Sequence, residues 1–121
     1  GEVVGWTFGH EVGPETFYMR NSAVLPPHRR KGIYSALLRA ILHHAADERY
    51  ERVTSRHAAT NNPVIIPKLR AGFLITGLEI SDVHGTLVTL TYFRDASREC
   101  ATRFRSGEMR LPPELLNHFE I

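Results

Sequence analysis

Alternating apolar and polar residues predict strands in two pairs of segments, each pair joined by a turn. The first pair runs from Glu2 to Val12 and from Thr16 to Leu25, around Gly13-Pro14-Glu15. The second pair runs from Phe73 to Val83 and from Thr86 to Arg94. Because a short turn brings consecutive strands side by side in opposite directions, each pair is expected to form an antiparallel hairpin.

Between the hairpins, the spacing of apolar residues changes to that of a helix. Apolar residues recur every three or four positions from Gly32 to Arg49, which predicts an amphipathic helix. Arg52 to Ala58 has the length of a short strand, and the segment from Asn62 to Arg70 reads as a second helix that Pro67 should kink or tighten. The order strand, helix, strand predicts a right-handed crossover between parallel neighbours.

These elements predict an α/β (α+β) fold, with a mixed sheet that has a hairpin at each end of the chain's core. A chain of 121 residues can bury one hydrophobic core but not two. We therefore assign residues 1–94 to a single core and residues 95–121 to a tail packed on the same domain. Within the tail, Ala96 to Arg105 and Pro112 to Phe119 are expected to be helical.

The turn between the second predicted strand and the first predicted helix carries the clearest chemical signal. Pro26 and Pro27 end the strand because neither can donate a backbone hydrogen bond. Gly32 then opens the helix without a side chain, so the first helical amides are accessible to an anion. With the basic run Arg29-Arg30-Lys31 beside those amides, the turn predicts a site for a phosphate or pyrophosphate.

Motif chemistry excludes other phosphate-binding classes at this turn. A P-loop needs glycine before lysine, whereas Lys31 precedes Gly32, and a dinucleotide fold needs a second glycine two residues on, where Tyr34 stands. A net charge of +2, with four basic residues in His28–Lys31 and no stacking aromatics, gives poor support for nucleic-acid binding.

Composition places the chain among ordinary globular proteins, with 42% hydrophobic and 23% charged residues. Cys100 is the single cysteine, so no intramolecular disulfide is possible and the cysteine has no metal-ligand spacing. No apolar run approaches the ~20 residues that span a bilayer. We expect a cytoplasmic protein without a membrane segment or a metal site.

Two motifs give the chain a family resemblance. Arg29-Arg30-Lys31-Gly32-Ile33-Tyr34 resembles the R/Q-x-x-G-x-G/A signature of the GNAT superfamily of acyl-CoA-dependent N-acetyltransferases. About thirty residues later, Asn61-x-x-Val64-Ile65 and Lys68-x-Arg70-Ala71-Gly72-Phe73 resemble the second signature, N-x-x-A-I-x-L-Y-x-K-x-G-F. The order and separation of the two motifs support the resemblance, which covers roughly residues 1–94.

The resemblance implies a GNAT-type mixed sheet and acetyl-CoA as co-substrate. The pyrophosphate would lie on the backbone amides from Arg30 through Ser35. The pantetheine arm would lie between the segments Thr16–Leu25 and Arg52–Ala58 and pair with their backbone as an added strand. The cofactor-binding residues it implies are Val24, Leu25, Arg29, Arg30, Lys31, Gly32, Ile33, Tyr34, Ser35 and Asn61.

For catalysis, the resemblance implies direct attack of an amine on the thioester in a ternary complex, with the Leu25 amide stabilising the oxyanion. The usual glutamate base is missing, and Lys68 stands where the family's tyrosine acid would be. Lys68 is either a proton donor, an electrostatic partner of the thiolate, or an exposed helix lysine, which is the commoner case. His57 is the candidate base, with a half-buried histidine bonded to backbone as the alternative.

The sequence therefore predicts transfer of an acetyl group from acetyl-CoA to a primary amine of undetermined class. The alternative is a non-catalytic acyl-CoA-binding or regulatory domain. The family's usual first strand and helices are missing, which would expose the edge of the strand Glu2–Val12. A fragment, a covering tail or a second copy would each explain this, and we expect a homodimer.

Overall fold

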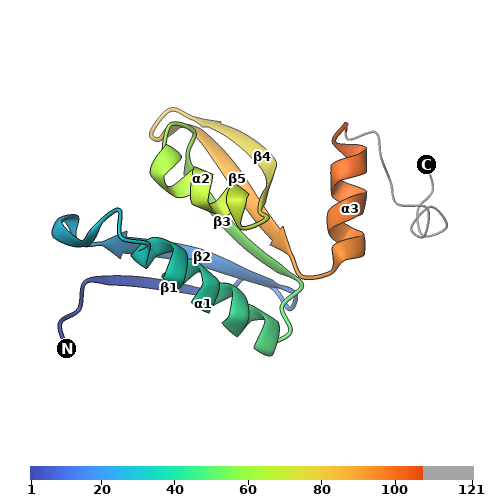
Figure 1. Cartoon of the computed structure of the whole chain (residues 1–121). Helices are drawn as coiled ribbons and strands as arrows, with labels where there is room; N and C mark the ends of the chain where they lie inside the picture. Colours follow the sequence, from blue (N-terminus) through green and yellow to red (C-terminus); the bar gives the residue numbers. More distant parts are fainter. Residues whose placement is uncertain (108–121) are drawn as a thin grey trace.

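The structure, a computed structural model, describes residues 1–107 and contains a five-stranded sheet in the order β1-β2-β3-β5-β4 (Figure 1). The strands are β1 (Gly5–Glu11), β2 (Thr16–Val24), β3 (Arg52–Ala58), β4 (Leu74–Ser81) and β5 (Gly85–Phe93). The pairs β1–β2 and β4–β5 are antiparallel, whereas β2 and β3 are parallel. Both predicted hairpins and the predicted crossover are confirmed.

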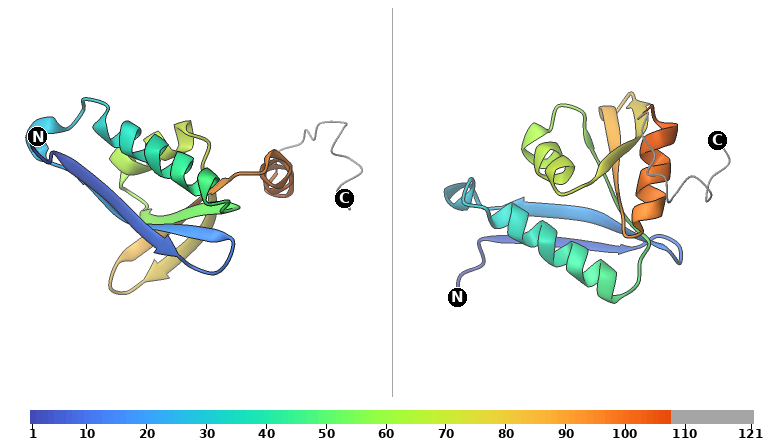
Figure 2. Two further views of the ribbon diagram at one scale, coloured as in Figure 1. Left: turned by 90° about the horizontal axis from the view of Figure 1, so that it is seen from below. Right: turned by 45° about the vertical axis from the view of Figure 1, so that its right-hand side comes forward.

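Within residues 1–107, three helices accompany the sheet: α1 (Ile33–Asp47), α2 (Asn62–Arg70) and α3 (Ala96–Arg105). A single 3₁₀ turn, η1 (Pro26–His28), connects β2 to the loop before α1. Helices α1 and α2 lie on the same face of the sheet, and α3 lies beyond the end where the strands converge (Figure 2). No helix in the described residues is long and apolar enough to cross a membrane.

One sequence prediction on element limits needs correction. The first strand begins at Gly5 rather than Glu2, and the outermost hydrogen bond between the first two strands joins the Leu25 amide to the Val4 carbonyl. Helix α2 has the predicted limits and continues through Pro67, where the sequence predicts a kink or a tightened turn. The proline removes only one backbone hydrogen bond there, and the buried side chains of α2 hold the helix on the sheet. The helix predicted at residues 112–119 lies outside the described residues.

The hydrophobic core fills the space between the sheet and helices α1 and α2. Its centre is formed by Leu38 of α1, Val53 of β3 and Leu90 of β5, which are at most 2% exposed. The remaining buried members are Phe17, Met19, Ala45, Ile65, Phe73 and Val88. Because this core joins both helices to the same sheet, it holds α1 and α2 side by side on one face of it.

The tail begins with α3, which packs on β5 and buries Ala101. Asp95 caps the helix, its Oδ1 accepting a hydrogen bond from the Ser97 amide at 2.8 Å. Arg98 lies 3.6 Å from the carboxylate of Glu15, in the turn between β1 and β2. These contacts place α3 against the closed end of the sheet, away from its open end.

Strands β2 and β3 diverge after a short stretch of pairing. The pairs are Thr16–Arg52, Phe17–Val53 and Tyr18–Thr54, and no pair follows. Beyond that point β2 pairs only with β1, as far as Val24, and β3 only with β5, as far as Ala58. The sheet therefore opens into a wedge between β2 and β3, visible in Figure 1 as the separation of the lower and upper layers.

A β-bulge in β2 lies beside the start of this wedge. Phe8 pairs with Asn21 and Gly9 pairs with Met19, so Arg20 is an extra residue without a partner on β1. The bulge brings the backbones close at Gly9, where an added Cβ would overlap the Tyr18 carbonyl oxygen. Glycine is thus required at this position by the neighbouring backbone.

We expect Gly9→Ala to lower the free energy of unfolding by about 1–3 kcal/mol, because the added carbon overlaps a backbone atom that cannot rotate away. Chemical denaturation measures the effect. Gly77→Ala is the matched control, since Gly77 also lies at a strand irregularity but its Cβ would meet only the Thr89 side chain, at 3.2 Å. Equal stability of Gly9→Ala and the parent chain would contradict the bulge.

Candidate functional site

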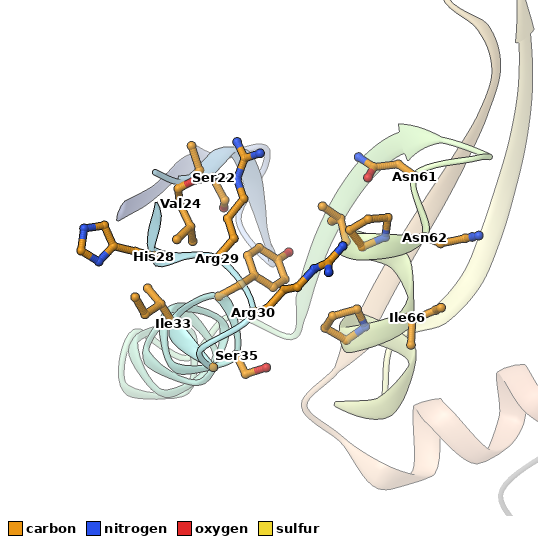
Figure 3. Close-up of a pocket in the computed structure, with 16 residues that line it drawn as sticks. Ser22, Val24, His28, Arg29, Arg30, Ile33, Ser35, Asn61, Asn62 and Ile66 are labelled. Atoms are coloured by element: carbon orange, nitrogen blue, oxygen red, sulfur yellow. Dashed lines mark hydrogen bonds between the residues drawn. The ribbon is translucent and has the colours of Figure 1, made fainter. Parts of the chain in front are cut away.

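A cleft of about 900 Å³ lies at the open end of the wedge, between the N-termini of α1 and α2 (Figure 3). Eight of the ten predicted cofactor-binding residues line it: Val24, Arg29, Arg30, Gly32, Ile33, Tyr34, Ser35 and Asn61. Leu25 and Lys31 do not line it. Its other lining residues are Ser22, Ala23, His28, Asn62, Pro63, Val64, Ile66 and Pro67, several of which the sequence analysis did not assign to the site.

The turn before α1 presents backbone amides to this cleft. Arg30 and Gly32 have left-handed conformations, with φ of 64° and 79°, which form a concave run of amides of the kind that binds anions. Gly32 caps α1 without a side-chain hydrogen bond, so the first amides of the helix have no cap. A Cβ on Gly32 would meet no protein atom within 4 Å, so the glycine leaves open space rather than relieving a clash.

Arg29 links the turn before α1 to the end of β2 by a hydrogen bond. Its Nε donates a hydrogen bond to the Val24 carbonyl oxygen at 2.9 Å. The Leu25 amide donates to the Val4 carbonyl oxygen at 2.7 Å. The oxyanion role predicted for the Leu25 amide is therefore wrong, because this amide faces β1 and already has a partner.

The pairing pattern shows which backbone groups of β2 face the wedge instead. Hydrogen-bonded and non-hydrogen-bonded pairs alternate along an antiparallel ladder. Because Val4 and Leu25 form a hydrogen-bonded pair, Gly5–Val24 and Thr7–Ser22 are non-hydrogen-bonded pairs. The side chains of Thr7 and Ser22 meet at 2.7 Å, as such close pairs permit. The backbone groups of Ser22 and Val24 thus point toward β3, across the wedge.

Asn61 lies at the N-terminus of α2. It occupies the cap position of α2, but its side chain makes no capping hydrogen bond. The amide group is instead on the wall of the cleft opposite the α1 turn (Figure 3). It is therefore available to a ligand lying between the two helices.

A smaller hollow of about 180 Å³ adjoins the cleft. The two share four lining residues, Ser22, Tyr34, Asn61 and Val64, so they adjoin at these residues. The other residues that line the hollow are Met19, Arg20, Asn21, Arg56, His57 and Lys68. Arg56 and His57 are neighbours on β3 and so point to opposite faces of the sheet. Because the hollow is lined from both faces and by residues of β2 as well, it occupies the opening between β2 and β3.

Tyr34 stands where the cleft meets the hollow. Burial raises the pKa of its phenol to about 12, so the hydroxyl keeps its proton near neutral pH. This residue replaces the small residue of the GNAT signature, and it supplies a hydrogen-bond donor at the junction of the two spaces.

Lys68, Ser55 and His57 form a compact cluster at the inner end of the hollow. Lys68 Nζ lies 2.6 Å from Ser55 Oγ and 3.1 Å from His57 Nε2, and this nitrogen lies 2.9 Å from Ser55 Oγ. The Lys68 amine lies over the face of the Phe73 ring, with Nζ 5.3 Å from the ring centroid. Each polar side chain of the cluster is thus held by the other two.

The interpretation of Lys68 as an exposed lysine is wrong, since this residue is 1% exposed. Burial lowers the pKa of its amine to about 7, and among residues 1–107 no carboxylate pairs with it. The amine is therefore substantially neutral near physiological pH. Its spacing of three residues from Ile65, on the buried face of α2, is the sequence signal that indicates its burial.

His57 is half-buried, as the alternative interpretation expected, but its partners are side chains rather than backbone. Burial, together with the charge of Lys68, lowers the pKa of its imidazole to about 4. It therefore remains neutral at physiological pH. Ser55, which holds both residues and is fully buried, was not assigned to the site from sequence.

Replacing Lys68 by methionine is expected to change how stability depends on pH. The folded chain holds Lys68 at a pKa of about 7, below the ordinary 10.5, so between these values the unfolded chain binds more protons. Stability should rise with pH across this window, by at most about 1.4 kcal/mol per pH unit. Lys68→Met should lose that slope, as measured by urea denaturation from pH 7 to 10. An identical slope in both chains would contradict a buried neutral amine.

The sequence of the chain matches a known family. The model of the acetyltransferase (GNAT) family matches residues 1–73, more than half of the chain. The chain belongs to the GNAT acetyltransferase family. The family assignment made from the two motifs is confirmed, and so is the GNAT-like mixed sheet. A comparison with curated protein sequences gave no match.

Solved structures of other proteins share the fold at low sequence identity. Ard1 from Thermoplasma volcanium is 24% identical with a TM-score of 0.72, over 77% of this chain and 64% of Ard1. A GNAT acetyltransferase from Elizabethkingia anophelis, solved with acetyl-CoA bound, is 18% identical with a TM-score of 0.72, over 76% of this chain and 69% of the other. An IAA acetyltransferase from Bacillus cereus is 20% identical with a TM-score of 0.69, over 77% and 71%. This GNAT chain thus spans about two thirds of the length of these structures.

Proposed function

We propose that this GNAT chain binds acetyl-CoA in the cleft and transfers its acetyl group to a primary amine. The observation that carries the proposal is the buried Lys68 amine, which lines the hollow that adjoins the cleft. A cleft alone would suit a binding domain. A neutral amine with no carboxylate partner in residues 1–107, next to that cleft, adds a group able to move a proton.

The cleft offers three kinds of contact to the co-substrate. The uncapped amides from Arg30 to Ser35 suit the pyrophosphate, with the side chains of Arg29 and Arg30 adding positive charge. The Ser22 carbonyl and the Val24 amide, which face the wedge, suit the amide groups of the pantetheine arm. Asn61 offers its side chain from the opposite wall. Acetyl-CoA bound in this way would lead its thioester toward the hollow.

In the proposed reaction, the acceptor amine in the hollow attacks the thioester carbonyl carbon. The nitrogen–carbon bond forms while neutral Lys68 takes the proton that the amine loses. The Ser22 amide replaces that of Leu25 as the oxyanion donor. The carbon–sulfur bond then breaks, and the Lys68 ammonium returns its proton to the departing thiolate. The products are an N-acetylated amine and CoA.

This assignment moves the role of base from His57 to Lys68. A base works best when its pKa is near the working pH, and the imidazole has a pKa of about 4 against about 7 for Lys68. We propose that His57 and Ser55 position the Lys68 amine through their hydrogen bonds of 3.1 and 2.6 Å.

Two measurements on the same sample test the proposal. Calorimetric titration with CoA measures binding, and release of free thiol from acetyl-CoA in the presence of amines measures transfer. We expect saturable binding and amine-dependent thiol release. Binding without thiol release for any amine would support the non-catalytic alternative, and absence of CoA binding would contradict the assignment of the cleft.

A further inference from the structure

The hollow that adjoins the cleft has a strongly one-sided charge. Arg20 and Arg56 line it, and none of its ten lining residues is aspartate or glutamate. Lys68 and His57, which also line it, have pKa values lowered to about 7 and about 4, and the other polar side chains are neutral. A group bound here would meet two guanidinium groups, and no carboxylate lines the hollow itself.

Arg20 is directed to this space by the bulge of β2. As the extra residue of the bulge it has no partner on β1, and within the described residues no carboxylate forms an ion pair with it. Bulges change the direction of a side chain relative to a regular strand. The bulge that brings the two strands close together at Gly9 therefore also determines where the Arg20 guanidinium lies.

Arg56 reaches the hollow from the other strand. Its Nη2 lies 3.3 Å from the Glu79 carboxylate, and both side chains are about half exposed, at 47% and 52%. Glu79 does not line the hollow. The ion pair therefore restrains Arg56 while its other donors remain available, since a guanidinium carries five N–H groups.

These charges select among amines. An acceptor with further positive charges, such as a polyamine or an aminoglycoside, would face repulsion here with no carboxylate to receive it. An anionic group beside the amine would instead receive charged hydrogen bonds from the arginines. The cationic surroundings also lower the pKa of the bound amine and favour its nucleophilic, neutral form.

We propose that the acceptor is a small primary amine that also carries an anionic group, a carboxylate or a phosphate, bound by Arg20 and Arg56 with its amine toward Lys68. The volume of about 180 Å³ supports a small molecule, since pockets for drug-sized ligands are about 300–1,000 Å³. This inference rests on the proposed function, because it names the acceptor class of the same site.

Matched pairs of amines test the inference through thiol release. β-Alanine is compared with β-alaninamide and phosphoethanolamine with ethanolamine, so that each pair differs by its anion, and putrescine represents the polycations. We expect kcat/KM to be about tenfold or more higher for the anionic member, as charged hydrogen bonds of this kind provide. The two pairs distinguish carboxylate from phosphate. Equal or better turnover of β-alaninamide, ethanolamine and putrescine would overturn the inference.

Variants of the two arginines test whether these residues cause the preference for anionic amines. Arg20→Gln and Arg56→Gln are each expected to raise KM for the anionic amine about tenfold and to leave KM for its neutral partner unchanged. Arg39→Gln is the control, because Arg39 is an exposed arginine of α1 outside both spaces. An equal loss for both members of a pair would show a structural effect and overturn the specificity role.

A binding measurement separates this inference from the proposed function. N-acetyl-β-alanine and its amide, which carry no titratable amine, are titrated into the CoA-saturated chain. Tighter binding of the carboxylate, lost in Arg20→Gln, would support the anionic site even if no amine were acetylated. Equal binding of the two would overturn the inference even if transfer to other amines were observed.

Discussion

Replacing Lys68 by methionine is expected to lower kcat for acetyl transfer about 10²–10⁴-fold, the range for loss of a general acid–base group. Methionine is similar in length and apolar, so it can fill the space beside Ser55 and the Phe73 ring. Lys68 is 1% exposed, so the variant removes a buried amine together with the free-energy cost of burying it. The loss of turnover should therefore come without a loss of stability, and CoA affinity should be unchanged.

The pH profile distinguishes catalysis from packing in this experiment. In the parent chain, kcat/KM should rise as the pH increases through about 7, because Lys68 acts as a base only when neutral. Lys68→Met should lose that inflection. Arg70→Met, which removes an exposed cation from the same helix, serves as the control and should keep both rate and profile. Full activity of Lys68→Met would exclude the role proposed for this amine.

Replacing Gly32 by valine is expected to weaken CoA binding about 100-fold or more. The left-handed φ of 79° disfavours any side chain, and valine would place three carbons in the open space that the α1 amides face. Losing two charged hydrogen bonds of about 1.5–3 kcal/mol each accounts for an effect of this size. Calorimetric titration with CoA measures it.

Gly13→Val is a close control for this variant. Gly13 also has a left-handed φ, of 88°, and an added Cβ there would meet no atom within 4 Å, but it lies in the turn between β1 and β2 and does not line the cleft. Both variants should lose about 1–2 kcal/mol of stability from backbone strain. Only Gly32→Val should lose CoA binding. Equal affinities in the two variants would place the pyrophosphate elsewhere.

Local signals in the sequence predict most of the elements. The limits of β3, α2 and α3 agree with prediction, because a cap position with Pro63 begins α2 and the glycine at position 72 follows its end. The α1 turn and eight of ten expected residues assemble at one cleft, since most of these residues lie in or next to the two signature motifs.

The missed features depend on contacts between distant segments. Arg20 enters the site through a bulge beside Gly9 of the neighbouring strand, and although a glycine inside a strand is a signal for a bulge, it does not show which residue of β2 is the extra one. Ser55 looks like an ordinary strand residue until α2 places Lys68 over it. The role expected of the Leu25 amide is wrong because its direction depends on the register between β1 and β2.

The divergence of β2 and β3 has a mechanical consequence. One half of the sheet contains β1 and β2 with α1, and the other contains β3, β4 and β5 with α2. Only three residue pairs, between β2 and β3, join the two halves of the sheet. Tyr34 belongs to the first half, whereas Asn61 and Lys68 belong to the second. A ligand that forms hydrogen bonds with the backbones of β2 and β3 would hold the two halves together as an added strand would. The distance between Tyr34 and Lys68 would then depend on the co-substrate as well as on the fold.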